Sequence, residues 1–250
     1  MEHWKDKVAI VTGASAGIGK AVAAKLTEEG MRVAAVARRK ERLQELVNQY
    51  KGRIYAFPCD ITQDEELVKL FKTIEETIGP CHVLVNNAGT AFKSDVLECN
   101  LKEWRYMFDL NVIAVGVATR EAISSMKRNK IDDGQVINIS SIASKGIPGP
   151  EGIGRHVYNA TKHALRVLTE GARMELAQQK SGIKVSTICP GVVETEIFEV
   201  GGWGDIFLND QTPALQPNAI ADGVVTLLST PHSTHIADLV IRPLGEKLYS

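Results

Sequence analysis

The chain has 250 residues, 44% of them hydrophobic, and its 29 basic and 30 acidic residues give a formal net charge of −1. This length suffices for one large domain with a sizeable core. Charges of both signs are mixed along the chain, so we expect no nucleic-acid partner and no attraction to an anionic membrane. No apolar run is long enough to span a membrane.

The four cysteines are scattered and have no histidine at metal-ligand spacing: Cys59, Cys81, Cys99 and Cys189. We therefore expect no disulfide framework, no metal site and a reducing compartment. The apolar run at 8–11, behind a charged start, is too short for a signal peptide. These features favour a cytoplasmic protein.

Short apolar runs, each followed by a helical pattern, alternate along the whole chain. Strands are expected at 8–11, 33–36, 54–58, 83–85, 136–139, 185–188 and 239–241, and helices at 17–29, 41–50, 63–78, 101–129, 157–178 and 217–228. This alternation predicts an α/β fold: a doubly wound, Rossmann-like parallel sheet of about seven strands with helices on both faces. Without a linker or repeat, residues 1–250 are expected to form one domain.

A glycine-rich segment, TGASAGIG from Thr12 to Gly19, joins the first strand to the first helix. Glycines there permit a tight turn and let the backbone approach a pyrophosphate, while the helix N-terminus offers N–H groups to it. A strand-to-helix turn needs glycine for its own sake, so the loop alone is a weak signal. Its place in the first βα unit favours a dinucleotide site.

The second expected strand should end beside the adenosine ribose, where an acidic residue would bind the 2′-hydroxyl of NAD. The chain instead continues with Arg38, Arg39 and Lys40. A guanidinium can bind a phosphate through two parallel hydrogen bonds, so this run favours NADP(H) over NAD(H). The alternative is a solvated helix start.

Polar residues follow the later strands. Asn86-Asn-Ala-Gly89 ends the fourth strand, Asn111 lies in the following helix, and Ser141 ends the fifth strand. A buried asparagine can be purely structural, tying strands together or satisfying a kinked helix. The Ser141 hydroxyl could donate to a substrate oxygen. Taken together at strand carboxyl ends, these residues predict a site.

Tyr158 and Lys162 are four positions apart, which places them on one face of the expected helix at 157–178. An ammonium near the phenol favours phenolate. We expect Lys162 and an oxidised nicotinamide ring, both cationic, to lower the pKa of Tyr158 from its usual value of about 10. The pair would then exchange protons during a hydride transfer.

These motifs, over the whole chain, resemble those of the short-chain dehydrogenase/reductase family. The matching residues are Thr12–Gly19, Asp60-Ile61, Asn86–Gly89, Asn111, Ser141, Tyr158–Lys162 and PGVVET at 190–195. The finer pattern is similar to a group that includes the member 11-like reductases and the insect NADP-dependent farnesol dehydrogenases. Seventeen positions separate Ser141 from Tyr158. The extra residues form a glycine- and proline-rich loop at 146–156, so substrate specificity cannot be borrowed from relatives.

The resemblance implies that Tyr158 is the general acid/base, that Ser141 orients the substrate oxygen and that Lys162 binds the nicotinamide ribose. Asn111 would hold a water of the proton relay, and Asn86 and Gly89 would support the ribose. The implied cofactor contacts are Gly13, Ser15, Gly17, Ile18, Gly19, Arg38, Arg39, Asp60, Ile61, Asn87, Ala88, Gly89, Tyr158, Lys162, Pro190, Gly191, Val193 and Thr195.

Residues 194–216 are expected to form a substrate lid, because a glycine pair, Gly201-Gly202, is flanked by large apolar side chains. These are Phe198, Trp203, Ile206 and Phe207. The alternative is an ordinary loop with a buried tryptophan. No charge clamp is evident, although Arg155 and His156 border the site, and this suits a small apolar alcohol or ketone.

The expected helices at 101–129 and 157–178 carry more apolar residues than one face needs, which predicts a homodimer or homotetramer. Our interpretation is an NADP(H)-dependent oxidoreductase that interconverts alcohol and carbonyl on an apolar substrate, first a farnesol-like terpenoid alcohol. A ketosteroid or carbonyl reductase is the alternative. A hypothesis of another class is a non-catalytic NADP(H)-binding sensor or scaffold.

Overall fold

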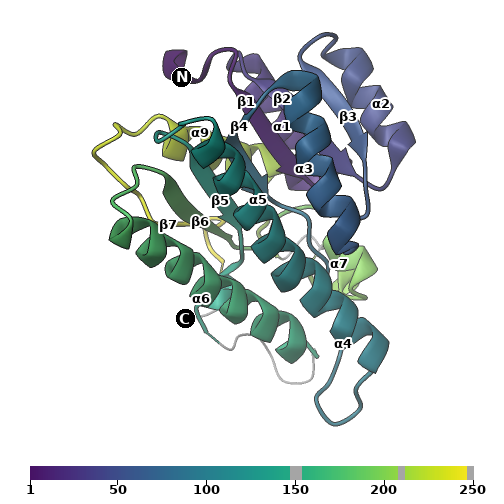
Figure 1. Cartoon of the computed structure of the whole chain (residues 1–250). Helices are drawn as coiled ribbons and strands as arrows, with labels where there is room; N and C mark the ends of the chain where they lie inside the picture. The colour runs from purple at the N-terminus through teal and green to yellow at the C-terminus, as the bar shows by residue number, and fades with distance from the viewer. Residues whose placement is uncertain (147–153, 208–211, 247–250) are drawn as a thin grey trace.

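The computed structural model describes residues 1–146, 154–207 and 212–246. Within these ranges one parallel sheet has seven strands in the order β3-β2-β1-β4-β5-β6-β7. Their bounds are β1 Val8–Thr12, β2 Arg32–Ala37, β3 Ile54–Pro58, β4 Cys81–Asn86, β5 Gln135–Ile139, β6 Lys184–Pro190 and β7 Asp238–Ile241. The predicted doubly wound, Rossmann-like sheet is confirmed (Figure 1).

Helices cover both faces of the sheet. In Figure 1, α3, α5 and α6 lie in front of it, and α1 and α9 lie behind. The bounds are α1 Gly17–Glu28, α2 Lys40–Gln49, α3 Asp64–Ile78, α4 Leu101–Phe108, α5 Ala114–Arg128, α6 His156–Gln178, α7 Ile197–Val200, α8 Gly204–Phe207 and α9 Pro217–Leu228.

Alternate strand residues belong to two separate cores. In β2, Val33 and Ala35 pack with the helices behind the sheet, whereas Ala34 and Val36 pack with those in front. Because successive side chains of a strand point to opposite faces, a sheet covered on both sides needs apolar residues at every position. This explains the continuous apolar runs of the sequence.

The sequence around several helix ends explains where they begin and stop. The Asn100 side chain accepts a hydrogen bond from the backbone N–H of Lys102 (3.1 Å) and caps α4. Pro217 occupies the first position of α9, where its missing N–H costs nothing. Gly79, with φ of 107°, follows α3. These boundaries are therefore set locally.

The predicted single helix at 101–129 is interrupted. Residues Asp109–Ile113 form a π-helical turn between α4 and α5. The Asn111 side chain in this turn accepts from the N–H of Thr90 (2.9 Å) and donates to its carbonyl oxygen (2.8 Å). The period of apolar residues does not predict this π-helical turn, because the contact made by its Asn111 side chain is with Thr90, in another segment of the chain.

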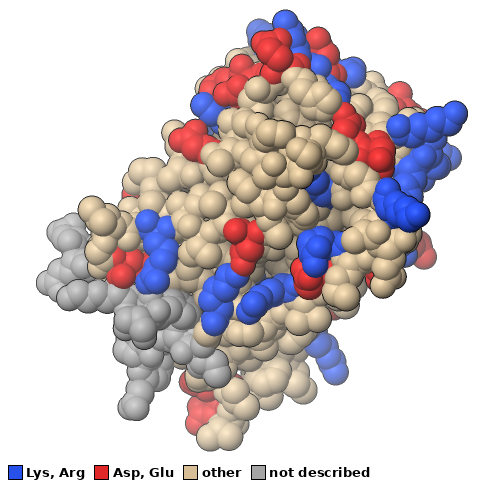
Figure 2. All heavy atoms as spheres, turned by 90° about the vertical axis from the view of Figure 1, so that its left-hand side faces the viewer, with Lys and Arg blue, Asp and Glu red and all other residues tan. Residues whose placement is uncertain are grey.

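Charges of both signs are interspersed on the face of the molecule shown in Figure 2. None of the helices in the described part of the chain is long and apolar enough to cross a membrane. Groups of three or more residues suited to hold a metal ion are likewise not found among the residues that the structure describes.

Candidate active site

The glycine-rich loop forms a cradle at the carboxyl end of β1. Gly13 and Gly17 have φ of 69° and 51°, a left-handed backbone conformation that is strained for residues with a side chain. A Cβ on Gly19 would lie 2.3 Å from the Gly13 carbonyl oxygen, so only glycine fits there. Ala16 supplies no side-chain cap to α1, whose first residues Gly17 and Ile18 line the pocket. This loop fits a pyrophosphate.

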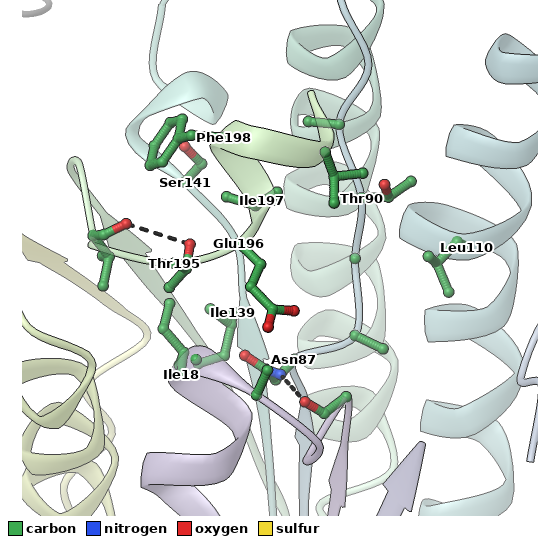
Figure 3. A pocket seen from close by; sticks show the side chains of 18 of the residues that line it. Ile18, Asn87, Thr90, Leu110, Ile139, Ser141, Thr195, Glu196, Ile197 and Phe198 are labelled. Atoms are coloured by element: carbon green, nitrogen blue, oxygen red, sulfur yellow. Dashed lines mark hydrogen bonds between the residues drawn. The ribbon is translucent and has the colours of Figure 1, made fainter. Parts of the chain in front are cut away.

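A hydrogen-bonded junction holds the ends of β1 and β4 together. The Thr12 hydroxyl oxygen accepts from the backbone N–H of Asn87 (3.0 Å) and of Ala88 (3.1 Å). The Asn87 amide donates to the Thr12 carbonyl oxygen (2.9 Å) and to the Gly13 carbonyl oxygen (3.3 Å), the second bond being the dashed line beside Asn87 in Figure 3. Strand order reverses between β1 and β4, which is where open α/β sheets bind their ligands.

Asn86 lies next to this junction but faces the protein interior. Its amide donates to the Thr119 hydroxyl (3.1 Å) and to the Asn138 side-chain oxygen (2.9 Å), and the residue is buried. It does not line the pocket, although Asn87 and Gly89 do. The expected ribose support by Asn86 is therefore wrong, because its side chain bonds to Asn138 and so ties β4 to the neighbouring strand β5.

Tyr158 and Lys162 stand on the first turns of α6 and face the pocket with Ser141. The Ser141 hydroxyl lies close enough to the Tyr158 phenol to influence its pKa. It also accepts from the N–H of Ala143 (3.1 Å), which fixes its position at the end of β5. The Lys162 ammonium donates to the Ile139 carbonyl oxygen (3.1 Å) and lies 5.7 Å from the centroid of the Tyr158 ring. The predicted spacing thus brings all three together.

Burial dominates the pKa shifts of Tyr158 and Lys162. Burial raises the pKa of the Tyr158 phenol above its usual value, and the opposing effects of the Ser141 hydrogen bond and the Arg155 charge are smaller. Burial also lowers the pKa of Lys162 to about 8. The predicted lowering of the Tyr158 pKa by Lys162 and an oxidised nicotinamide ring refers to the site with cofactor bound, and it stays a prediction.

Asn111 is buried and connects two segments that carry site residues. Besides its two bonds to Thr90, its amide donates to the Thr161 hydroxyl (3.1 Å) on α6, and only 1% of the residue is exposed. It does not line the pocket. The Asn111 side chain thereby ties the segment after Gly89 to the helix that carries Tyr158, and its expected role in a water relay stays a prediction.

The two arginines after β2 have different partners. Arg38 donates to the Tyr106 hydroxyl of α4 (2.7 Å), and its guanidinium lies 6.0 Å from the centroid of that ring. Arg39 donates to the Ser15 hydroxyl (3.0 Å) and forms an ion pair with Glu196 (2.7 Å). Both arginines line the pocket, where a ribose phosphate could contact them.

The rest of the predicted cofactor set also meets in this pocket. Asp60 accepts from the N–H and hydroxyl of Thr62 (3.1 and 2.8 Å), so its side chain shapes the turn before α3. The segment after β6 is held by Glu246, which accepts from the N–H of Val192 (2.8 Å). Of the predicted cofactor contacts, Gly19 alone does not line the pocket; those that do are Gly13, Ser15, Gly17, Ile18, Arg38, Arg39, Asp60, Ile61, Asn87, Ala88, Gly89, Tyr158, Lys162, Pro190, Gly191, Val193 and Thr195.

The expected lid contributes an apolar wall. Trp203 and Phe207 are each 2% exposed, and the rings of Phe198 and Phe207 are 5.1 Å apart. Ile206, in contrast, is exposed and is not part of this wall. Gly201 and Gly202 separate α7 from α8, and the expected hinge at this position stays a prediction. Residues 208–211 of the expected lid, and 147–153 of the expected loop before α6, lie outside the described residues.

The pocket contains a buried cation. Arg155 is 8% exposed, lines the pocket and lies 4.7 Å from the centroid of the Phe207 ring. His156, by contrast, is exposed and does not line the pocket. Arg155 was expected at the border of the site as a polar contact, and the structure places it, buried, on the pocket lining itself. Local sequence carries no signal for this, because burial of Arg155 depends on a ring that lies far along the chain.

Two pocket residues lacked any signal in the sequence. Tyr106 is 68 positions from Arg38, and Glu196 is 157 positions from Arg39. Neither belongs to a motif. Only the fold brings α4 and the segment after β6 to the carboxyl end of β2.

Comparison with known proteins agrees with this geometry. The family model for short chain dehydrogenase matches residues 7–201. The Bos taurus protein dehydrogenase/reductase SDR family member 11 is 36% identical, covering 97% of this chain and 98% of its own. Farnesol dehydrogenase of Aedes aegypti is also 36% identical, with 99% and 100% covered.

Solved structures resemble the whole fold. The closed form of serine dehydrogenase complexed with NADP⁺ has a TM-score of 0.85 at 27% identity, covering 94% of each chain. A variant of actinorhodin polyketide ketoreductase with NADPH has a TM-score of 0.83 at 27% identity, with 95% of this chain and 96% of the other covered. The sequence match and the shared fold lead to one conclusion: the chain belongs to the short-chain dehydrogenase/reductase family.

Proposed function

We propose that the protein is an NADP(H)-dependent oxidoreductase that interconverts a hydroxyl and a carbonyl group on an apolar molecule. One observation carries the proposal: a single pocket brings Ser141, Tyr158 and Lys162 to a glycine-rich loop and to Arg38. The acid/base groups and the cofactor cradle therefore open on the same space. Family membership supports an oxidoreductase acting on CH–OH groups with a nicotinamide cofactor.

The chain's own residues divide the work of the reaction. When bound, the cofactor supplies the hydride donor or acceptor. Ser141 holds the substrate oxygen near Tyr158, whose phenol gives a proton to a carbonyl or takes one from a hydroxyl. Lys162, fixed on the Ile139 carbonyl oxygen, places a positive charge beside the phenol. Trp203 and Phe198, which line the pocket and pack with Phe207, exclude water from one side.

NADP(H) rather than NAD(H) is supported by the charges after β2. Arg38 is held by a neutral phenol, and no carboxylate lies at ion-pair distance from it within the described ranges. Its positive charge is thus available to a 2′-phosphate. The two structural neighbours described above bind NADP⁺ or NADPH, which agrees with this assignment.

For the substrate we propose first a farnesol-like terpenoid alcohol and second a ketosteroid or other carbonyl compound. The apolar wall and the Aedes relative named farnesol dehydrogenase support the first. Arg155 favours a substrate that also carries a hydrogen-bond acceptor away from the reacting carbon, as a ketosteroid or dicarbonyl does. A non-catalytic sensor is the remaining hypothesis, and it predicts binding without turnover.

We further propose a homodimer or homotetramer in the cytoplasm. Exposed apolar side chains of α4, the π turn and α6 support self-association: Leu101, Phe108, Ile113, Val167, Leu168 and Met174. Free thiols at Cys59, Cys81, Cys99 and Cys189 fit a reducing compartment. Sedimentation at several protein concentrations tests the assembly.

The deciding experiment follows absorbance of reduced nicotinamide with farnesol, a hydroxysteroid and a simple secondary alcohol, each with NADP⁺ and NAD⁺. Turnover of farnesol with NADP⁺ supports the first substrate. Consumption of NADPH with a ketosteroid or diketone, without oxidation of any alcohol, supports the second. Binding of NADP(H) with no turnover of any substrate would favour the sensor.

A further inference from the structure

Glu196 joins two segments that are far apart in the chain. It follows Thr195 on the pocket wall and directly precedes α7, the first helix of the expected lid. Its Oε2 lies 2.7 Å from Nη1 of Arg39, and its Oε1 lies 2.5 Å from Nη1 of Arg42 on α2. Each carboxylate oxygen thus binds one guanidinium, and the segment after β6 is tied to the start of α2.

Arg39 stands between Glu196 and the glycine-rich loop. Its Nε donates to the hydroxyl of Ser15 (3.0 Å), and Arg39, Ser15 and Glu196 all line the pocket. In Figure 3 the Glu196 side chain extends from the wall with Thr195 toward the side of the pocket that holds Ile18 and Asn87. Its carboxylate therefore lies where the ribose of a nucleotide would approach the arginines after β2.

The ion pairs of Glu196 are of a kind that another anion can displace. The hydrogen bonds from Arg42 and Arg39 lower the pKa of Glu196, so it is ionised at neutral pH. The side chains of Glu196, Arg39 and Arg42 are each 44% exposed, and ion pairs with that much solvent contact are weak. A phosphate monoester carries nearly twice the charge of a carboxylate and has three acceptor oxygens.

We propose that Glu196 is a specificity-determining residue that competes with the 2′-phosphate of NADP(H) for Arg39. Wild-type affinity for a 2′-phosphorylated nucleotide is then weaker than the arginines alone would give, while affinity for a nucleotide without this phosphate is unaffected. When the phosphate takes Arg39, the Glu196 carboxylate loses one of its two ties to the β2–α2 segment, and the first turn of the lid is loosened. This inference rests on the proposed preference for NADP(H).

Glu196→Gln tests the competition, because it removes the charge and keeps the shape. The probes are adenosine 2′,5′-bisphosphate and 5′-AMP, which differ only in the 2′-phosphate, and binding is measured by titration calorimetry. We expect the variant to bind the bisphosphate about threefold to tenfold more tightly and to bind 5′-AMP as the wild type does. Glu199→Gln is the matched control: Glu199 is exposed on α7, three positions after Glu196, and does not line the pocket, so both affinities should stay unchanged.

Hydrogen exchange of the α7 amides supplies a second readout. Saturating bisphosphate should speed exchange in wild-type Ile197–Val200, whereas 5′-AMP should not, and Glu196→Gln should show fast exchange with either probe. Unchanged bisphosphate affinity in Glu196→Gln, with the wild type still preferring bisphosphate to 5′-AMP, would overturn the competition alone. If the wild type binds both probes equally, the NADP(H) preference itself fails and the inference fails with it.

Discussion

The two sides of the pocket are built by different means. On the proton-transfer side, Lys162 is buried, Ser141 and Tyr158 are partly buried, and all three sit at strand or helix ends. On the cofactor-selecting side, Arg38 and Arg39 are exposed, and their partners Tyr106 and Glu196 come from α4 and from the segment before α7.

This difference separates chemistry from selectivity. Burial fixes the side chains of Tyr158 and Lys162, and desolvation shifts their pKa values. This desolvation comes from all the residues that surround the two side chains and not from one partner. Exposed charges such as Arg38 interact through solvent, so their contribution depends on one or two partners and can change with a single substitution. We expect the proton-transfer side to tolerate almost no change and the selecting side to be tunable.

The largest effect is expected from Tyr158→Phe. Without the phenol oxygen, the substrate has no proton donor or acceptor, and turnover should fall about a thousandfold. Titration of the variant with NADP⁺ should still show binding, because the cradle is intact. Tyr55→Phe is the control, since the Tyr55 hydroxyl bonds only locally to the Gly52 carbonyl oxygen (3.1 Å) and lies outside the pocket. Full activity of Tyr158→Phe would contradict the acid/base assignment.

Arg38→Glu examines the selecting side. A carboxylate at this position repels a 2′-phosphate, so the ratio of kcat/KM for NADP⁺ to that for NAD⁺ should fall about a hundredfold. Tyr106→Phe should lower the same ratio by a smaller factor, because it removes only the hydroxyl that holds Arg38. An unchanged ratio in Arg38→Glu would transfer the phosphate contact to Arg39 or Lys40.

The raised pKa of Tyr158 predicts a different pH dependence for each reaction direction. Alcohol oxidation needs the phenolate, whose fraction grows tenfold per pH unit below the pKa, so kcat/KM should rise with a slope of about one between about pH 6 and pH 8. Carbonyl reduction needs the phenol, which is already protonated there, and should be nearly flat. A plateau of oxidation below about pH 7 would show that bound cofactor lowers this pKa.

The smallest effect on turnover is expected from Asn86→Ala. Loss of its amide leaves the buried Asn138 oxygen without that donor, and the free energy of unfolding should fall by about 1–3 kcal/mol. Turnover per folded molecule should be retained, because Asn86 does not line the pocket. Asn87→Ala, one position later, should instead weaken cofactor binding. Denaturant unfolding and nucleotide titration of both variants separate the two roles.

Much of the fold could be read from local patterns. Strands covered on both faces need continuous apolar runs, which predicted the central strands of the sheet, and the helices between the strands carried an amphipathic period. The glycine-rich loop and the Tyr158–Lys162 spacing were equally local. The π turn at Asp109–Ile113 was missed because its buried asparagine bonds to Thr90 and Thr161, and no period in the sequence records such contacts.

The sequence by itself determined the strand and helix order, the glycine-rich loop and the placement of Tyr158 and Lys162 on one helix face, because backbone preferences and side-chain periods act over a few residues. Only the tertiary structure decided the rest: that Asn86 ties strands, that burial raises the pKa of Tyr158, that Arg155 is buried in the pocket and that Glu196 binds Arg39. Desolvation and ion pairing depend on distances between segments that are far apart in the chain, and only folding sets those distances.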